Sequence, residues 1–147
     1  MVWKPNVTVA AVIEKEGRFL LVEEKTDTGT YFNQPAGHWE ADETIVQGVV
    51  RETLEETGYD FAPHALIGIY RWQNRRNDLI YLRFTFSGEA VAFHEARALD
   101  HGIIAAHWLS YDEVVLQKPR HRSPMVLRCI DDYRAGHRFP LTILANL

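Results

Sequence analysis

The sequence contains a single cysteine, Cys129, which excludes an intrachain disulfide and argues against a zinc cluster built on cysteine. It also has no apolar run approaching the roughly 18 residues that a membrane span requires. The N-terminal stretch MVWKPNVTVAAVIEKEGRF meets a proline at once, and it lacks the basic, apolar and cleavage regions of a signal peptide. We therefore expect a cytoplasmic protein without a membrane partner.

Basic residues are fewer than acidic ones: the sequence has 16 lysine and arginine residues, 20 aspartate and glutamate residues, and a net charge of −4. This balance gives no electrostatic reason to expect a nucleic-acid partner. The 147 residues are 46% hydrophobic and 12% aromatic, which suffices for one core. Repeats and linker-like stretches are absent. We expect a single domain over residues 1–147 and, without any marked interface, a monomer.

Hydrophobic patterning predicts more strands than helices. The expected strands are a hairpin of Val7–Gly17 and Arg18–Thr26, a short strand around Tyr31–Phe32, and Ala65–Gln73, Leu79–Ser87 and Ile104–Leu109. The expected helices are Glu43–Thr57, with Asp42 as N-cap and Gly58 as C-cap, Tyr111–Gln117 and Pro124–Ala135. Helices scattered among strands favour an α+β domain in which helices cover a mixed β-sheet.

The octet RETLEETG, residues 51–58, places Glu52, Glu55 and Glu56 within one arc of a helix. Like charges at i,i+4 destabilise a helix by roughly 0.2–0.5 kcal/mol per pair, and crowded carboxylates raise one another's pKa. Bound Mg²⁺ or Mn²⁺ would remove this repulsion, because both ions prefer hard oxygen ligands. The alternative is a solvated glutamate-rich face with an Arg51–Glu55 ion pair and no metal.

The apolar stripe of this helix and its internal glycine also bear on whether the glutamates bind a metal. A broad apolar stripe should pack on the sheet, and Glu56 borders it, so we expect its carboxylate to be partly buried. Gly48 lies one turn before Glu52. A glycine inside a helix costs roughly 1 kcal/mol relative to alanine, and room for a bulky group over that face would compensate.

The segment GHWEADETIVQGVVRETLEETGY, residues 37–59, resembles the Nudix box, G-x5-E-x7-R-E-U-x-E-E-x-G-U, in which U is a bulky aliphatic residue. The matching positions are Gly37, Glu43, Arg51, Glu52, Glu55, Glu56 and Gly58. Thr53 and Tyr59 depart from the two U positions, which concern packing and not charge. KPNVTVAAVI, NQPAGHWEADET, RSP and YRAGHRFPL extend the likeness over nearly the whole chain, and they resemble the NudJ-type phosphatases of the Nudix superfamily.

This resemblance implies a Nudix-like α/β/α sandwich and a hydrolase that uses Mg²⁺, with Mn²⁺ as a possible substitute. It assigns the metal to Glu52, Glu55, Glu56 and the carbonyl oxygen of Gly37, and it assigns a structural ion pair to Arg51 and Glu43. The implied reaction removes the terminal phosphate from nucleoside tri- and diphosphates and from hydroxymethylpyrimidine pyrophosphate of thiamine synthesis. Two alternatives are a MutT-like enzyme that releases pyrophosphate and a non-catalytic nucleotide-sensing module.

Several candidate residues lie outside the box. The water-activating base is Glu52 or a neighbouring box carboxylate, or a residue of an outside loop, for which Asp100 is preferred over Glu95 and Glu89. Phosphoryl transfer needs positive charge around the phosphates, and the candidates for that role are Arg83 and Arg122. Trp72, with Tyr70 and Phe32 as further candidates, could stack on a base or pyrimidine ring. Each of these arginines and aromatic residues also has a plain surface or core interpretation.

Overall fold

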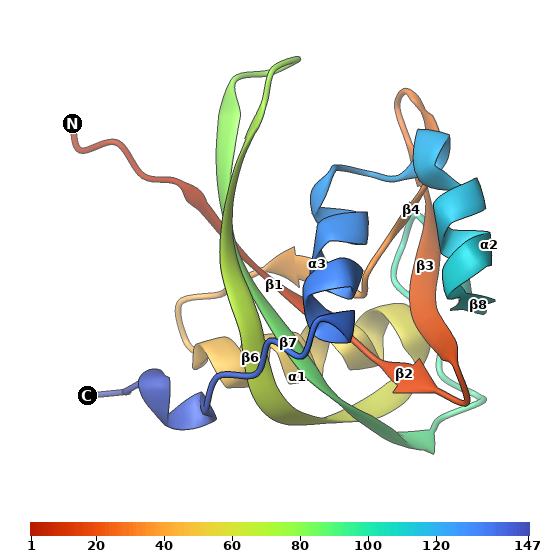
Figure 1. The fold of residues 1–147 in the computed structure, drawn as a ribbon. Coiled ribbons are helices and arrows are strands. Elements are labelled where there is room, and N and C mark those ends of the chain that lie inside the picture. The colour runs from red at the N-terminus through yellow and green to blue at the C-terminus, as the bar shows by residue number, and fades with distance from the viewer.

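The structure is a computed structural model that describes residues 1–147, and its strands form two sheets (Figure 1). The first sheet has the order β5 (Ala36–His38), β1 (Asn6–Val12), β7 (Leu79–Phe93) and β6 (Tyr59–Asn74). In it β1 runs parallel to β7, and the other neighbours are antiparallel. The second sheet is antiparallel and consists of β2 (Glu14–Lys15), β3 (Arg18–Thr26), β4 (Gly29–Asn33) and β8 (Ile103–Ser110), which pairs with β3.

The predicted N-terminal hairpin is only partly correct. Of the predicted first strand, Val7–Gly17, only Glu14–Lys15 pairs with β3. The two strands are joined by a turn at Glu16 and Gly17, where both φ angles are positive. β1 instead lies between β5 and β7 in the other sheet. Its last five residues are all buried, and a near-continuous apolar run of this kind is typical of a strand that is covered on both faces.

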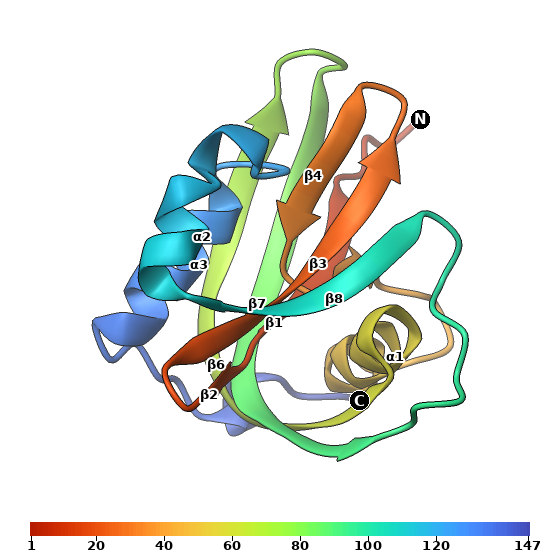
Figure 2. The same cartoon turned by 90° about the vertical axis from the view of Figure 1, so that its right-hand side faces the viewer.

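Helices cover the strands on two sides, as Figure 2 shows. Helix α1 (Ile45–Thr57) packs on one side, and α2 (Tyr111–Leu116) and α3 (Met125–Arg134) pack on the other. Side chains alternate between the two cores: Leu20 of β3 joins the core under α1, whereas Phe19 and Leu21 join the core under α3. The predicted α/β/α sandwich is confirmed. Short 3₁₀ turns occur at Lys118–Arg120 and Leu141–Ile143.

The start of α1 differs from the prediction, and its end agrees with it. The N-cap is Thr44 and not Asp42: the Thr44 hydroxyl accepts a hydrogen bond from the Gln47 N–H at 3.0 Å, and the Gln47 side chain accepts one from the Thr44 N–H at 2.8 Å. This reciprocal pair forms a capping box. Gly58 ends the helix with φ of +78°, the left-handed conformation that glycine tolerates best.

The strands β6 and β7 are longer than predicted and form a hairpin whose turn projects beyond the sheet (Figure 1). Register shifts near Pro63 keep β6 paired with β7 where the proline interrupts regular bonding. The remaining predicted strands and helices agree with the structure to within a few residues. No helix combines the length and the apolar character that crossing a membrane would need.

Candidate active site

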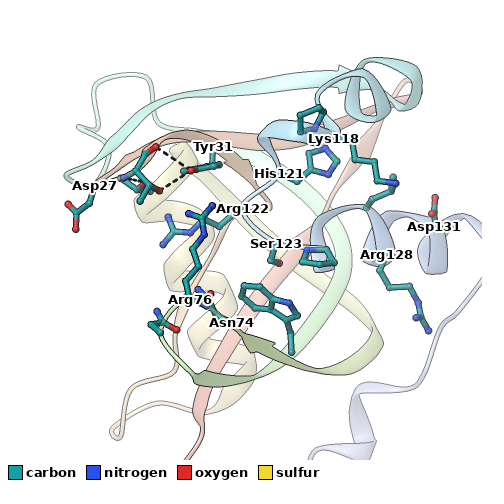
Figure 3. A pocket seen from close by; sticks show the side chains of 17 residues that line it. Asp27, Tyr31, Asn74, Arg76, Lys118, His121, Arg122, Ser123, Arg128 and Asp131 are labelled. Atoms are coloured by element: carbon teal, nitrogen blue, oxygen red, sulfur yellow. Dashed lines mark hydrogen bonds between the residues drawn. The ribbon is translucent and has the colours of Figure 1, made fainter.

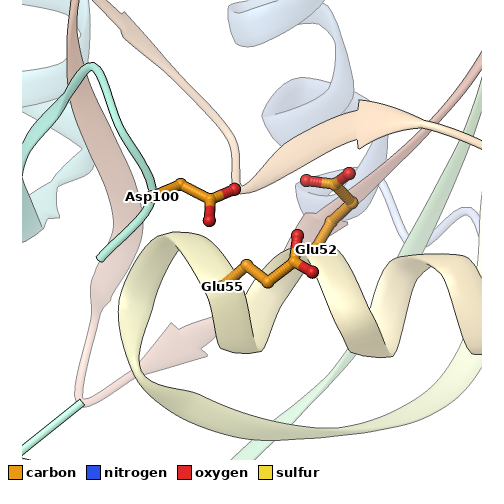
Figure 4. A group of neighbouring side chains, drawn as sticks. All are labelled: Glu52, Glu55 and Asp100. Carbon is orange, nitrogen blue, oxygen red and sulfur yellow. The ribbon is translucent and has the colours of Figure 1, made fainter. Parts of the chain in front are cut away.

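Three carboxylates meet beside helix α1. Glu52 and Glu55 lie one turn apart on one face of the helix, and Asp100 faces them from the loop between β7 and β8 (Figure 4). One carboxylate oxygen from each lies within 4.8 Å of the others. The Asp100 N–H also donates a hydrogen bond to the Glu55 carbonyl oxygen at 3.0 Å, which fixes the loop against the helix. Asp100, the preferred base candidate, is therefore at the carboxylate group.

The other two base candidates do not join this group. Glu89 and Glu95 are both exposed, and neither belongs to the carboxylate group of Glu52, Glu55 and Asp100. The loop that carries Glu95 also carries Asp100, so sequence position alone does not distinguish them. The backbone bond from Asp100 to Glu55 determines which acid of the loop faces the helix.

Gly37 of β5 lies directly against Glu52. A Cβ atom placed on Gly37 would be 2.2 Å from the Glu52 carboxyl carbon and 2.3 Å from both carboxylate oxygens, distances at which no side chain fits. The absence of a side chain at Gly37 therefore gives the Glu52 carboxylate its space. It also brings the β5 backbone next to the acidic group.

Glu56 lies behind the group. Its side chain accepts a hydrogen bond from the Ala36 N–H at 2.9 Å, and it is buried as expected, with 8% of the residue exposed. Burial raises the pKa of Glu56 to about 9, and the negative charges of Glu52, Glu24 and Asp100 contribute. Burial also raises the pKa of Glu52 to about 7, against the lowering effect of Arg51. Crowding and burial thus disfavour the charged forms of both acids.

Arg51 connects these acids to the start of the helix. It makes two bonds to Glu43, at 2.7 and 2.8 Å, so the expected Arg51–Glu43 ion pair is present. The same guanidinium contacts Glu52 at 2.8 Å and Glu55 at 3.1 Å. Its hydrogen bonds to Glu43 hold the pKa of that carboxyl below its usual value. The Arg51–Glu55 ion pair that the metal-free interpretation expects is therefore present, and its Glu55 side chain also belongs to the acidic group.

The space left by Gly48 is occupied by residues of the box itself. A Cβ atom on Gly48 would be 3.0 Å from a Glu43 carboxylate oxygen and 3.6 Å from the Trp39 ring. The Trp39 indole N–H in turn donates to the Glu43 carbonyl oxygen at 2.7 Å. The glycine thus allows the loop that precedes α1 to lie close to the helix, where Glu43 meets Arg51.

The residue types of the group fit a divalent cation. All three side chains offer carboxylate oxygens, the hard donors that Mg²⁺ and Mn²⁺ prefer over nitrogen or sulfur. Glu52 and Glu55 also form ion pairs with the same Arg51 guanidinium. The acidic group can therefore hold a metal ion. Glu56, also a predicted ligand, accepts a hydrogen bond from the Ala36 N–H, and its role as a ligand remains a prediction.

A cavity of about 250 Å³, called the inner cavity here, adjoins this region. Its lining includes Gly37 and all three predicted substrate-binding residues, Arg83, Arg122 and Trp72. The structure thus brings together residues that lie up to 85 positions apart in the sequence, from Gly37 to Arg122.

Arg83 is a buried cation in the wall of this cavity. It is 3% exposed, and its two terminal nitrogens donate to the side-chain oxygens of Gln34 at 2.8 Å and Asn33 at 2.9 Å. Both acceptors are neutral amides, and the Arg83 Nε atom has no hydrogen-bond partner. Buried charges are ordinarily paired with an opposite charge. An anion in the inner cavity would balance the positive charge of the guanidinium, although the Nε atom itself is closed off from solvent.

The other predicted substrate residues have partners of their own. Arg122 contacts Glu24 at 3.3 Å, and Trp72 stacks on Tyr81 with ring centroids 5.8 Å apart. The two further stacking candidates do not line the cavity: Phe32 is buried in the core under α3, and the Tyr70 hydroxyl donates to Asp132. Alternating apolar positions place aromatic rings on a strand but do not tell which face meets a cavity.

Sequence reasoning missed several cavity residues. Asn33, Glu24 and Tyr81 line the inner cavity, and Gln34 holds Arg83 through a chain that continues to the Val126 carbonyl oxygen at 2.7 Å. The one available signal was the position of Asn33 and Gln34 just before Pro35–Gly37. Cys129 is fully buried, as expected for a packing residue.

The fold and the acidic group are those of a Nudix hydrolase. Residues 3–128 match the family model described as NUDIX domain, and the chain belongs to this family. It is 40% identical over 144 residues to the Phosphatase NudJ of Escherichia coli K12 and of Shigella flexneri, across 98% of this chain and 93% of those proteins. Divalent metals are general in Nudix hydrolases, in keeping with the oxygen donors found here.

Solved structures agree. A NUDIX hydrolase from Nitrosomonas europaea superposes with a TM-score of 0.96 at 53% identity, and 98% of each chain is covered. The NUDIX domain of Shewanella oneidensis NrtR, solved with ADP ribose, superposes with a TM-score of 0.74 at 16% identity over 91% of this chain and 89% of that one. The second likeness shows the shared fold only.

Proposed function

We propose that this Nudix hydrolase is a Mg²⁺-dependent phosphatase that removes the terminal phosphate from nucleoside tri- and diphosphates. The observation that carries the proposal is the adjacency of an acidic group, Glu52, Glu55 and Asp100, to a cavity that contains the unpaired cation Arg83. The phosphatase name of the 40% identical relatives favours release of phosphate over release of pyrophosphate. Small-molecule nucleotides are thus the proposed substrates.

In this proposal Glu52, Glu55, Glu56 and the Gly37 carbonyl oxygen hold Mg²⁺, or Mn²⁺ in its place. When bound, the ion supplies charge neutralisation for the phosphoryl oxygens and lowers the pKa of water. Asp100 faces the same space from the other side and orients or deprotonates the attacking water. Arg51 and Glu43 keep the box loop in place against the helix.

Arg83 and Arg122 bind the phosphate that remains on the product. The buried Arg83 guanidinium has no anionic partner within the protein, so a phosphate oxygen there completes its charge balance. Trp72, stiffened by its stacking on Tyr81, offers a flat surface for a ring. The inner cavity of about 250 Å³ is also compatible with a small ring such as that of hydroxymethylpyrimidine pyrophosphate, which we propose as a second substrate.

The deciding experiment measures phosphate and pyrophosphate separately for a panel of nucleoside tri- and diphosphates and hydroxymethylpyrimidine pyrophosphate, with Mg²⁺ and with chelator. We expect phosphate from triphosphates and diphosphates alike, and loss of turnover on chelation. Nucleoside monophosphate plus pyrophosphate from a triphosphate would instead establish the MutT-like alternative. Nucleotide binding in calorimetry without any product would establish a sensing module.

The role of Asp100 has a matched control in the same loop. Asp100→Asn should lower kcat by about 10² or more, because general-base contributions are typically of that size. Glu95→Gln, which changes an exposed acid outside the group, should keep wild-type turnover. Equal effects of the two substitutions would contradict the role given to Asp100.

The role of Arg83 is tested by Arg83→Gln, read through KM and the affinity for the product nucleotide. Both should weaken by about tenfold or more, because a hydrogen bond to a charged group is worth roughly 1.5–3 kcal/mol. Unchanged product affinity in a folded variant would remove Arg83 from the site. The cytoplasmic location, the single domain and the monomer remain predictions, and sedimentation of the purified chain measures the last of them.

A further inference from the structure

A second, larger cavity of about 810 Å³, the outer cleft, continues from the inner cavity. The two share Trp72, Asn74, Asn77, Arg122 and Ser123 in their linings. The outer cleft alone extends to the turn between β3 and β4, and it reaches further than the inner cavity along the turn between β6 and β7 and along α3. A ligand that begins at the acidic group can therefore extend through the inner cavity into the outer cleft.

The outer cleft does not have the composition of a pocket for a base. Only 3 of its 17 lining residues are hydrophobic, whereas pockets for ring-shaped ligands are lined predominantly by apolar and aromatic side chains. Its charge is positive although the whole chain carries −4. The cations are Arg76, Lys118, Arg122 and Arg128, and the carboxylates are Asp27 and Asp131.

Two of these cations face each other. Figure 3 shows the Arg76 and Arg122 side chains reaching toward one another, Arg76 from the β6–β7 turn and Arg122 from the segment before α3. Both are close enough to the Tyr31 hydroxyl to help lower the pKa of that phenol, after its hydrogen bond to Thr28. The Arg122 guanidinium has a single carboxylate partner, Glu24 at 3.3 Å, and Arg76 has none.

Of the other basic residues of the outer cleft, Arg128 and His121 have partners of their own, whereas Lys118 has no ion-pair partner. Arg128 is tied to Asp132 at 3.0 Å, one turn along α3. The His121 ring bonds the Val114 carbonyl oxygen at 2.8 Å, and burial lowers its pKa, so it contributes a neutral imidazole. Two guanidiniums that face one another repel, and an anion between them reverses the sign of the interaction.

We propose that Arg76 and the Tyr31 hydroxyl form a second phosphate subsite together with Arg122, which lines both cavities and is shared with the phosphate that remains on the product. The preferred substrates are then nucleotides with a further phosphate on the ribose, away from the one that is cleaved. The inference rests on the proposed function, because it assumes that the cleaved end lies at the acidic group. At about 250 Å³ the inner cavity is smaller than the roughly 300–1,000 Å³ of most ligand pockets, so we place the ribose at the junction of the two cavities. Its 3′-oxygen is then next to the outer cleft.

Binding of product-type nucleotides tests this subsite without any turnover. Adenosine 5′-monophosphate is compared with adenosine 3′,5′-bisphosphate, and the guanosine pair likewise, by calorimetry with Mg²⁺ present. We expect the doubly phosphorylated member of a pair to bind about tenfold or more tightly, the size of one charge-assisted hydrogen bond. The preference should fall with added salt, since exposed charges are screened.

Two neighbouring arginines supply the matched variants. Arg76→Gln should reduce the preference to about threefold or less, as expected for the loss of one of two guanidiniums. Arg75→Gln removes the adjacent charge, which does not line either cavity, and should retain the wild-type preference. The subsite would be refuted if the wild-type protein bound the monophosphate and the bisphosphate equally well in both the adenosine and the guanosine pair. It would also be refuted if Arg76→Gln and Arg75→Gln reduced the preference for the bisphosphate to the same extent.

The same measurements separate this inference from the proposed function. Release of phosphate from nucleoside diphosphates without any preference for the doubly phosphorylated ligand refutes the subsite and leaves the phosphatase intact. A tenfold binding preference without release of phosphate supports the subsite and refutes the phosphatase.

Discussion

The carboxylate of Glu52 lies where a Cβ atom on Gly37 would stand, so that a single added methyl group on Gly37 would overlap the acid. The two residues lie 15 positions apart in the sequence, on β5 and α1. Their contact joins the backbone of a short strand to the acidic group, and it explains why the box needs glycine here although no positive φ is involved.

Gly37→Ala should lower the free energy of unfolding by about 1–3 kcal/mol, the usual size of overpacking in a tight site. It should also displace Glu52 and reduce turnover. Denaturant unfolding and phosphate release measure the two effects. In the double variant Gly37→Ala, Glu52→Ala the clash is gone, so the stability should recover relative to Gly37→Ala while activity stays low. Additive stability effects would contradict direct contact.

Mg²⁺ should raise the melting temperature of the protein at neutral pH, because it binds the folded acidic group. At a concentration of about 100 times its Kd, a ligand contributes about 2.7 kcal/mol. Asp100→Asn should reduce this stabilisation, whereas Glu95→Gln should leave it at the wild-type value. A melting temperature that does not respond to Mg²⁺ or Mn²⁺ in the wild-type protein would instead favour the metal-free interpretation of the glutamate face.

Glu56 gives a pH dependence whose sign follows from its burial. Because the pKa rises from 4.5 to about 9 on folding, the folded state keeps a proton that the unfolded state loses. The metal-free protein should therefore lose stability as pH rises through this interval, in total by a few kcal/mol.

Glu56→Gln should reduce this loss of stability with pH, because glutamine does not titrate. The part that comes from Glu52, whose pKa is raised to about 7, should remain. Urea unfolding in chelator at several pH values measures the slope, and Glu95→Gln should keep the wild-type slope. Turnover of Glu56→Gln should also be abolished at saturating Mg²⁺ if Glu56 supports the metal site. A wild-type slope together with wild-type turnover would contradict both roles.

Glu43→Gln should weaken the attachment of the box loop to α1. The two bonds from Arg51 to Glu43 lose their ionic character, and we expect a cost of about 1–3 kcal/mol in stability. Arg51 would remain bound to Glu52 and Glu55. Glu40→Gln is the matched control, since Glu40 is more exposed and lies 3.7 Å from Arg51. A smaller effect of Glu43→Gln than of Glu40→Gln would refute this ranking.

The parts of the site that the sequence predicts are those that a helix determines locally. Spacing alone places Glu52 and Glu55 on one face, whereas the Arg51–Glu43 pair was implied by the resemblance and depends on the loop before α1, which lies against the helix at Gly48. The N-cap was predicted at Asp42 because aspartate is a common cap. Thr44 takes that role because Gln47 lies three residues beyond it and completes the reciprocal pair.

What the sequence left open depends on pairing between distant strands. The sequence favoured Asp100 over Glu95 and Glu89 but could not place any of these acids against the helix. Asp100 reaches the helix because β8 pairs with β3 and the loop before β8 bonds to Glu55. The burial of Arg83 was missed for a related reason. A polar residue between apolar ones suggests an exposed face, yet Arg83, Thr85 and Ser87 all point inward and are buried. Their strand, β7, lies inside the sheet, between β1 and β6.

The hydrogen bond that holds the Asp100 loop to α1 runs from one main-chain atom to another. Every amino acid except proline can make it. A substitution at position 100 can therefore change the side chain while the segment keeps its course. Reactivity at this position is free to diverge between descendants of one ancestor, at little risk to the architecture that surrounds it.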